Sequence, residues 1–200
     1  MKRFSLMVML SLVFVLNACG NDLKGDAQLN DADLTEFENG LLDLMSGGAF
    51  AFDLEVNNDD LQEIHSTVDY YTNGTFNRHV LDFNTAIDPS KGQDPVRIIF
   101  IPQQIDDQHV QWTSSIMSNG VDTAEQSTFT SEAIPIETTS YASGPTGLPA
   151  PLVIDKKKIV ASTVYSDKNG ITTYQSIETE QDIQQATDYE DVFLVTMELH

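Results

Sequence analysis

Apolar and polar residues alternate along much of the chain, and this period of two predicts β-strands. In the segment 50–56 apolar residues occupy every second position, which is typical of a strand buried on one face. The run 96–101 is apolar except for Arg97, so we expect a central strand there. A further strand is predicted at 192–199. Strands therefore account for most of the predicted domain.

An Asn73-Gly74 dipeptide between the strand-like runs 64–72 and 75–83 predicts a β-hairpin. Asn-Gly tolerates the two positive φ angles of a type I′ turn, which fixes the register of the flanking strands. The predicted cross-strand pairs are Tyr71–Phe76, Asp69–Arg78, His65–Asp82 and Ile64–Phe83. In this register five apolar side chains and one histidine share the core face: Ile64, Val68, Tyr70, Leu81, Phe83 and His79.

Two more hairpins are predicted at Asn-Gly dipeptides. One joins 109–117 to 126–134 around Asn119-Gly120, and the other joins 159–166 to 171–177 around Asn169-Gly170. Many short strands separated by regular turn signals are typical of an all-β fold. We therefore expect an antiparallel β-sandwich built of hairpins, with a barrel as the alternative.

Helical spacing of apolar residues is confined to 34–45 and, more weakly, 179–186. Residues 20–33 are small, polar and acidic without an apolar period, which predicts a flexible spacer. The expected organisation is a leader at 1–18, a tether with a short helix at 19–47, and a sandwich domain at 48–200.

The segment from Pro135 to Pro151 is rich in Ser, Gly and Pro and lacks a period that would support a strand. We expect a long loop there. Loops of this length inside a compact domain are usually functional or mobile. The segment is therefore the favoured binding loop, and a linker between two halves of the domain is the alternative.

The first residues have the pattern of an export signal. Lys2 and Arg3 precede a mostly apolar run, 4–16, which is shorter than the roughly 20 residues that a membrane-spanning helix needs. Leu16-Asn17-Ala18-Cys19-Gly20 follows, and this sequence resembles the lipobox of bacterial lipoproteins. The resemblance covers residues 1–20.

This resemblance implies that Cys19 receives a diacylglyceryl group, becomes the mature N-terminus and holds the protein on a membrane. Two or more acyl chains give stable anchoring where one chain does not. The lipobox, polar spacer and acidic strand-rich domain together are similar to uncharacterised small lipoproteins of bacilli and their relatives. The alternative is a soluble secreted protein whose cysteine lies near the cleavage site.

Charge narrows the range of partners. Cleavage after residue 18 would remove two of the 10 basic side chains and leave 31 acidic ones, a formal charge of -23. Such a field repels nucleic acid and anionic lipid head groups. We expect the charge to serve solubility, with a surface for cations or a cationic partner as the alternative. Cys19 is the one cysteine, so lipidation would leave no thiol for a disulfide, zinc site or nucleophile.

Catalytic and metal-binding motifs are absent from the sequence. His65, His79, His109 and His200 show no helical pair or His-Glu-x-x-His run, so we expect no metal ligands among them. Ser143 and Ser90-Lys91 lack the spacing of a serine nucleophile, and phosphate-binding glycine loops are missing. We therefore predict no catalytic residues and no cofactor.

Three acidic turns and a group of aromatic residues are the remaining candidate sites. Asp167-Lys168-Asn169-Gly170 lacks the outer carboxylates of a calcium loop, and Asn57–Asp60 and Asp106-Asp107 are weak calcium corners that fit plain turns better. A ligand platform or a sandwich core could each use the aromatic residues, and we favour the core with Tyr165 opposite Tyr174. These residues are Trp112, Tyr70, Tyr71, Tyr165 and Tyr174.

The favoured function is a membrane-anchored, extracytoplasmic β-sandwich that binds a protein or envelope component without catalysing a reaction. An extracytoplasmic hydrolase with scattered residues is the first alternative, and it predicts a polar pocket with perturbed carboxylates. A weak calcium-binding surface module is the second. A two-lobed solute-binding lipoprotein is disfavoured because alternating strand and helix units are missing.

Overall fold

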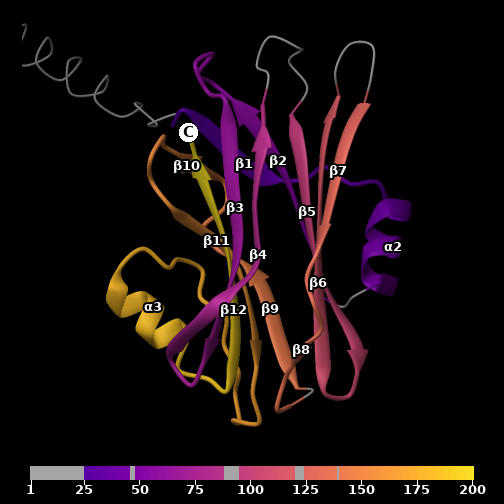
Figure 1. Ribbon diagram of the computed structural model, residues 1–200, viewed down its shortest axis with the longest axis vertical. Coiled ribbons are helices and arrows are strands. Elements are labelled where there is room, and N and C mark those ends of the chain that lie inside the picture. The colour runs from indigo at the N-terminus through magenta and orange to yellow at the C-terminus, as the bar shows by residue number, and fades with distance from the viewer. Residues whose placement is uncertain (1–24, 46–47, 88–94, 120–123, 139) are drawn as a thin grey trace, which may run out of the picture.

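The computed structural model describes residues 25–45, 48–87, 95–119, 124–138 and 140–200. Within these residues the chain forms twelve strands and two helices. The strands make two antiparallel sheets that pack face to face (Figure 1), so the predicted all-β sandwich is confirmed. The helices α2 and α3 lie on opposite sides of this sandwich.

The first sheet, called sheet A, has the order β10-β1-β2-β5-β6-β7, and β8 also pairs with β6. The predicted strands at 50–56 and 96–101 lie side by side within it, and the second of them is longer than expected. The predicted hairpin of 109–117 with 126–134 is also present, as β6 and β7. The bounds are β1 Ala27–Asp31, β2 Phe50–Val56, β5 Val96–Asp106, β6 His109–Asn119, β7 Ala124–Thr130, β8 Ile134–Pro135 and β10 Ala150–Leu152.

The second sheet, called sheet B, has the order β4-β3-β12-β11-β9. Strand β12, predicted at 192–199, lies at its centre and pairs with β3 and β11. The bounds are β3 Glu63–Thr72, β4 Thr75–Ala86, β9 Tyr141–Pro145, β11 Lys158–Tyr165 and β12 Asp191–Leu199.

The core between the sheets is centred on Phe193 of β12. Its ring stacks on Tyr70 with centroids 4.8 Å apart and contacts Trp112 at 5.5 Å and Tyr165 at 5.9 Å. All four side chains are buried. Aromatic pairs of this kind add about 0.5–1.5 kcal/mol beyond the burial of their area. Trp112, Tyr70 and Tyr165 are therefore core residues and do not form a ligand platform.

The Asn73-Gly74 hairpin is confirmed, with φ angles of 49° and 78° at the two turn residues. Tyr71 faces Phe76 as predicted. Beyond that pair the predicted register is wrong, because two irregularities each add a residue to β4 and the later partners of β3 shift. The five apolar residues assigned to the core face are nevertheless buried: Ile64, Val68, Tyr70, Leu81 and Phe83.

The same shifts move His79 away from the predicted core face. His79 faces Asp69 in the actual register, whereas Arg78 faces Tyr70. The predicted Asp69–Arg78 pair is therefore replaced by an Asp69–His79 ion pair. His65 and Asp82 are no longer directly opposite but still approach to 2.8 Å.

The segment that the polar pattern assigned to a flexible tether contains strand β1. Residues 27–31 pair with β2 on one side and β10 on the other, and Ala27 and Leu29 are fully buried. The sandwich therefore begins about twenty residues before the predicted boundary at 48. The alternation in AQLND is too short and too polar to stand out in the sequence, and pairing on both edges stabilises it.

The segment 135–151 is not one long loop, because it contains β9 and β10. Both strands lie at sheet edges, β9 in sheet B and β10 in sheet A. An edge strand has one row of unpaired backbone groups, so it tolerates the Pro and Gly residues that hid these strands in the sequence. The segment therefore connects the two sheets.

The predicted hairpin around Asn169-Gly170 is wrong in its second half. Residues 171–177 form no strand, and β11 pairs with β9 and β12 instead. Tyr165 accordingly faces Tyr141 rather than Tyr174. The Asn-Gly signal marks a turn here, with Gly170 at a φ of 85°, but no strand returns from it.

Both predicted helices are present, α2 at Glu36–Met45 and α3 at Glu180–Ala186. A capping box starts α3, in which the Thr179 hydroxyl accepts from the Asp182 backbone N–H and the Asp182 carboxylate accepts in return. Helix α2 buries none of its residues, so its apolar side chains Phe37, Leu41, Leu44 and Met45 face solvent. Neither described helix has the length and hydropathy required to span a bilayer.

Candidate functional site

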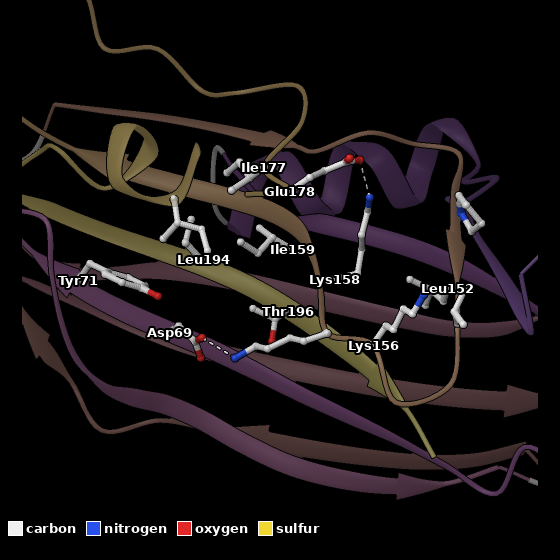
Figure 2. Close-up of a pocket in the computed structure, with 14 residues that line it drawn as sticks. Asp69, Tyr71, Leu152, Lys156, Lys158, Ile159, Ile177, Glu178, Leu194 and Thr196 are labelled. Atoms are coloured by element: carbon white, nitrogen blue, oxygen red, sulfur yellow. Dashed lines mark hydrogen bonds and ion pairs between the residues drawn. The ribbon is translucent and has the colours of Figure 1, made fainter. Parts of the chain in front are cut away.

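A pocket of about 430 Å³ lies on the outer face of sheet B, beside α3. Small-molecule sites commonly have volumes of about 300–1,000 Å³. Strands β3, β11 and β12 form its base, and the segments that precede β11 and α3 form its walls. Figure 2 shows Ile159, Ile177 and Leu194 between an ion pair at Asp69 on one side and the Lys158–Glu178 pair on the other.

Asp69 supplies a buried carboxylate to the pocket, with its side chain 6% exposed. Thr67 donates to its Oδ1 atom at 2.5 Å, His79 Nδ1 lies 2.7 Å from the same oxygen, and Lys157 donates to Oδ2 at 2.8 Å. Burial alone raises the pKa of a carboxyl group, but these three partners outweigh it and the pKa of Asp69 is lowered. Asp69 is therefore ionised at neutral pH.

Three consecutive lysines give the pocket a basic edge on a chain whose net charge is -21. Lys157 is bound to Asp69, and Lys158 Nζ lies 3.0 Å from Glu178 Oε1. The hydrogen bond from Lys158 lowers the pKa of Glu178. Among the residues that the structure describes, Lys156 has no carboxylate within 4.0 Å. Its ammonium group is therefore available to a ligand.

Apolar side chains from a small second core form the floor of the pocket. Ile177 and Leu194 are buried, and Ile159 and Ile183 pack against them. The capping box at Thr179 fixes the start of α3 and so positions Ile183 over this floor. The pocket thus combines an apolar floor with a positively charged edge.

A family model described as the YgaN domain matches residues 28–199. The chain belongs to the YgaN domain family. No curated protein and no solved structure matches it. The YgaN match begins within β1 and ends with β12, so the domain includes the pocket and the strand that the sequence pattern assigned to the tether.

The proposed lipidation site, Cys19, lies outside the residues that the structure describes, as do the rest of the lipobox and Ser90-Lys91. Ser143 lies in β9 of the YgaN domain, where its hydroxyl is 2.9 Å from that of Thr163 and bonds to the Gly48 carbonyl. No histidine is among these partners, so they are structural contacts of an edge strand.

Each of the three acidic turns of the YgaN domain uses one side-chain oxygen in a hydrogen bond, which is local in two of them and joins distant residues in the third. Asn58 Oδ1 accepts from the Asp60 backbone N–H at 3.0 Å, and Asp106 Oδ1 accepts from a backbone N–H two residues later at 2.8 Å. Asp167 accepts from the Thr138 hydroxyl. Each arrangement is that of an Asx-type turn or a loop contact.

The four histidines of the chain take three different positions. His79 belongs to the Asp69 network, and His109 pairs with Asp106 at 2.8 Å. His65 and His200 come together, with ring centroids 6.3 Å apart, although 135 positions separate them in the sequence. Tyr71 is the one residue of the predicted aromatic platform that lines the pocket.

The pocket residues could not be found by motif. The run of three lysines at Lys156–Lys158 in an acidic chain is the one feature of the sequence that points to this pocket. Its partners on β3 and β12 become neighbours only through strand pairing.

Proposed function

We propose that this chain is a lipid-anchored, extracytoplasmic binding module whose YgaN domain binds an organic anion in the pocket beside α3. The observation that carries this proposal is the position of Lys156 at the edge of an apolar floor. Lys157 and Lys158 are already paired with Asp69 and Glu178, whereas Lys156 has no carboxylate partner among the described residues. A ligand carboxylate or phosphate would complete the pairing.

The rest of the pocket favours an anion that also has an apolar portion. The acidic surface repels free anions, so the attraction must be local and the remaining affinity must come from apolar contact. Ile177, Ile183 and Leu194 supply that contact next to the lysines. A short or medium-chain fatty acid has both features, and inorganic phosphate has one of them.

Binding fits the pocket better than hydrolysis does. A general acid or base works best with a pKa near the working pH. The carboxyl groups of Asp69 and Glu178 have pKa values below their usual range because each accepts bonds from a lysine. Such groups are suited to holding cations in place rather than to moving protons.

The anchor in this proposal is Cys19, which rests on the lipobox resemblance. Because β1 begins at Ala27, eight residue steps separate it from Cys19, a span of at most about 28 Å. Acyl chains on Cys19 would therefore hold the YgaN domain close to the membrane surface. This distance is much shorter than a tether ending at residue 47 would allow.

The pocket proposal can be tested by titrating octanoate and inorganic phosphate into the protein and following backbone amide shifts by NMR. We expect octanoate to shift amides of β11, β12 and the segment before α3, and phosphate to bind more weakly. Lys156→Glu should reduce the affinity for octanoate at least tenfold. Lys168→Glu is the matched control, because Lys168 lies outside the pocket and the charge change is the same.

An unchanged affinity in Lys156→Glu, or an equal loss in Lys168→Glu, would show that the pocket lysine does not recognise the anion. Shifts confined to regions outside sheet B would place binding elsewhere and refute the proposal.

A further inference from the structure

A cluster of two imidazoles and one carboxylate lies on the outer face of sheet B. His65 of β3 and Glu198 of β12 are direct cross-strand partners, and His200 follows β12. One ligand atom from each of the three residues lies within 4.8 Å of the other two. Sheet pairing therefore assembles three potential metal ligands that are far apart in the sequence.

Each imidazole of the cluster is oriented by a second carboxylate. His65 Nε2 lies 2.8 Å from Asp82 Oδ1, and His200 Nδ1 lies 3.2 Å from Asp155 Oδ1. Each ring keeps its other nitrogen for a further partner. In metal sites a ligating histidine almost always bonds through its second nitrogen to a carboxylate, carbonyl or water, which fixes the ring and raises its basicity.

The backbone beneath the cluster is held in place by the ladder of sheet B. The backbone N–H of His200 donates to the Glu63 carbonyl at 2.9 Å, and the His200 carbonyl accepts from the N–H groups of Gln62 and Glu63 at 2.9 and 3.0 Å. The Asp155 N–H donates to the Leu199 carbonyl at 2.9 Å. These bonds fix the backbone of His200 and of its carboxylate partner without the help of a ligand.

We propose that His65, Glu198 and His200 form a binding site for a divalent transition-metal ion, with zinc as the best match. Two nitrogens and one oxygen suit zinc, whereas calcium and magnesium prefer oxygen ligands alone. Tetrahedral coordination at about 2.0–2.1 Å puts ligand atoms about 3.4 Å apart, so the side chains need to close by about 1.4 Å at most. A water molecule would take the fourth position.

The surrounding charge favours a cation at this position. Glu198, Asp82 and Asp155 contribute three carboxylates around two imidazoles that are neutral when they coordinate a metal. The bound ion would join β3 to the residue that follows β12 and so brace one end of sheet B. This proposal does not depend on the anion pocket or on the anchor.

The test is calorimetric titration of zinc into the untagged full chain carrying Cys19→Ser, after removal of bound metal with EDTA. The Cys19→Ser background removes the one thiol, which would otherwise bind zinc. We expect one zinc ion per chain, and a loss of affinity of at least tenfold in each of His65→Ala and His200→Ala. Calcium should bind at least tenfold more weakly than zinc.

His109→Ala is the matched control. Like the two cluster histidines, His109 is partly exposed and paired with an aspartate, but it does not belong to the cluster of His65, Glu198 and His200. Glu198→Gln keeps the side-chain size and removes the charge, so it separates loss of a ligand from loss of packing. Circular dichroism of the metal-free variants checks the fold.

Absence of zinc binding would overturn the proposal. So would a stoichiometric site that survives both histidine substitutions, or an equal loss in His109→Ala. If His65→Ala fails to fold, Glu198→Gln decides the test. Full affinity for zinc in Glu198→Gln would then overturn the proposal, because the carboxylate would not be a ligand.

Discussion

The Nζ atom of Lys157 lies 2.8 Å from Oδ2 of Asp69, although 88 positions separate the two residues in the sequence. Asp69 is in β3 and Lys157 precedes β11, so the contact passes over β12, which lies between those strands. The ion pair therefore joins the two neighbours of the central strand of sheet B. It also fixes the lysine segment that forms the edge of the pocket.

Asp69→Asn should lower the free energy of unfolding by about 1–3 kcal/mol at pH 7, since a buried hydrogen-bonded charge is lost. Because the folded-state pKa of Asp69 is lowered, its stabilisation is present above the unfolded-state value of about 3.9 and is lost as pH falls through the folded-state value. Urea denaturation should therefore show a constant difference between the two proteins above about pH 5 and a shrinking one below about pH 4.

Asp82→Asn is the control for Asp69→Asn, because the Asp82 side chain is 54% exposed and its pair with His65 is at the surface. A change below about 0.5 kcal/mol is expected for it. If Asp69→Asn were equally mild at pH 7, the buried network would not contribute to stability.

Phe193→Ala should be among the most destabilising substitutions in the core. Its ring is fully buried against Tyr70, Trp112 and Tyr165, and truncation of a buried phenylalanine costs about 3–5 kcal/mol. Phe37→Ala makes the same change at a position that is 74% exposed on α2 and should cost less than about 0.5 kcal/mol. Chemical denaturation compares the two, and similar losses would contradict the assigned core.

Two glycines should respond to alanine in opposite directions. Gly74 has a φ of 78° in the hairpin turn, where alanine is strained, so Gly74→Ala should destabilise the protein by about 1 kcal/mol or more. Gly40 is inside α2 with open space around its Cα, so Gly40→Ala should slow amide exchange in that helix by up to about fivefold, equivalent to about 1 kcal/mol. A stabilising Gly74→Ala would refute the turn geometry.

The lipid anchor predicts that Cys19→Ser prevents lipidation and the cleavage that depends on it, so the variant should keep residues 1–18. Mass spectrometry of the wild-type N-terminus should show a diacylglyceryl cysteine and loss of residues 1–18, and neither should be found in the variant. The same N-terminal processing in both proteins would refute the anchor. Asn17→Ala is the companion change, because it leaves Cys19 in place and should preserve processing.

Local signals predicted the parts of the fold that depend on neighbours in the chain. The turn at Asn73-Gly74 and the alternation in β2 are encoded in a few consecutive residues, and both are present. Strands β1 and β9 were missed because their sequences are short and polar or rich in Ser and Gly. Their extended form comes from pairing with strands far away in sequence.

The register of β3 with β4 shows why a correct hairpin does not give every contact. Nothing in the sequence marks the two irregularities that shift the partners of Asp69 and His65. The two candidate sites could not be predicted from the sequence for a related reason. The contacts of Lys157 with Asp69 and of His65 with His200 form only when the strands of sheet B are in their correct order.

The place where the chain enters the sandwich has a mechanical consequence. Strand β1 is bonded along both edges, with five cross-strand pairs to β2 and three to β10. A pull along the strand from the N-terminal side would load these antiparallel bonds together in shear rather than peel them apart one at a time. A protein held from its N-terminal end would therefore meet force at a strand that is paired on both sides, and the load would pass to β10, which supplies Pro151 and Leu152 to the lining of the pocket.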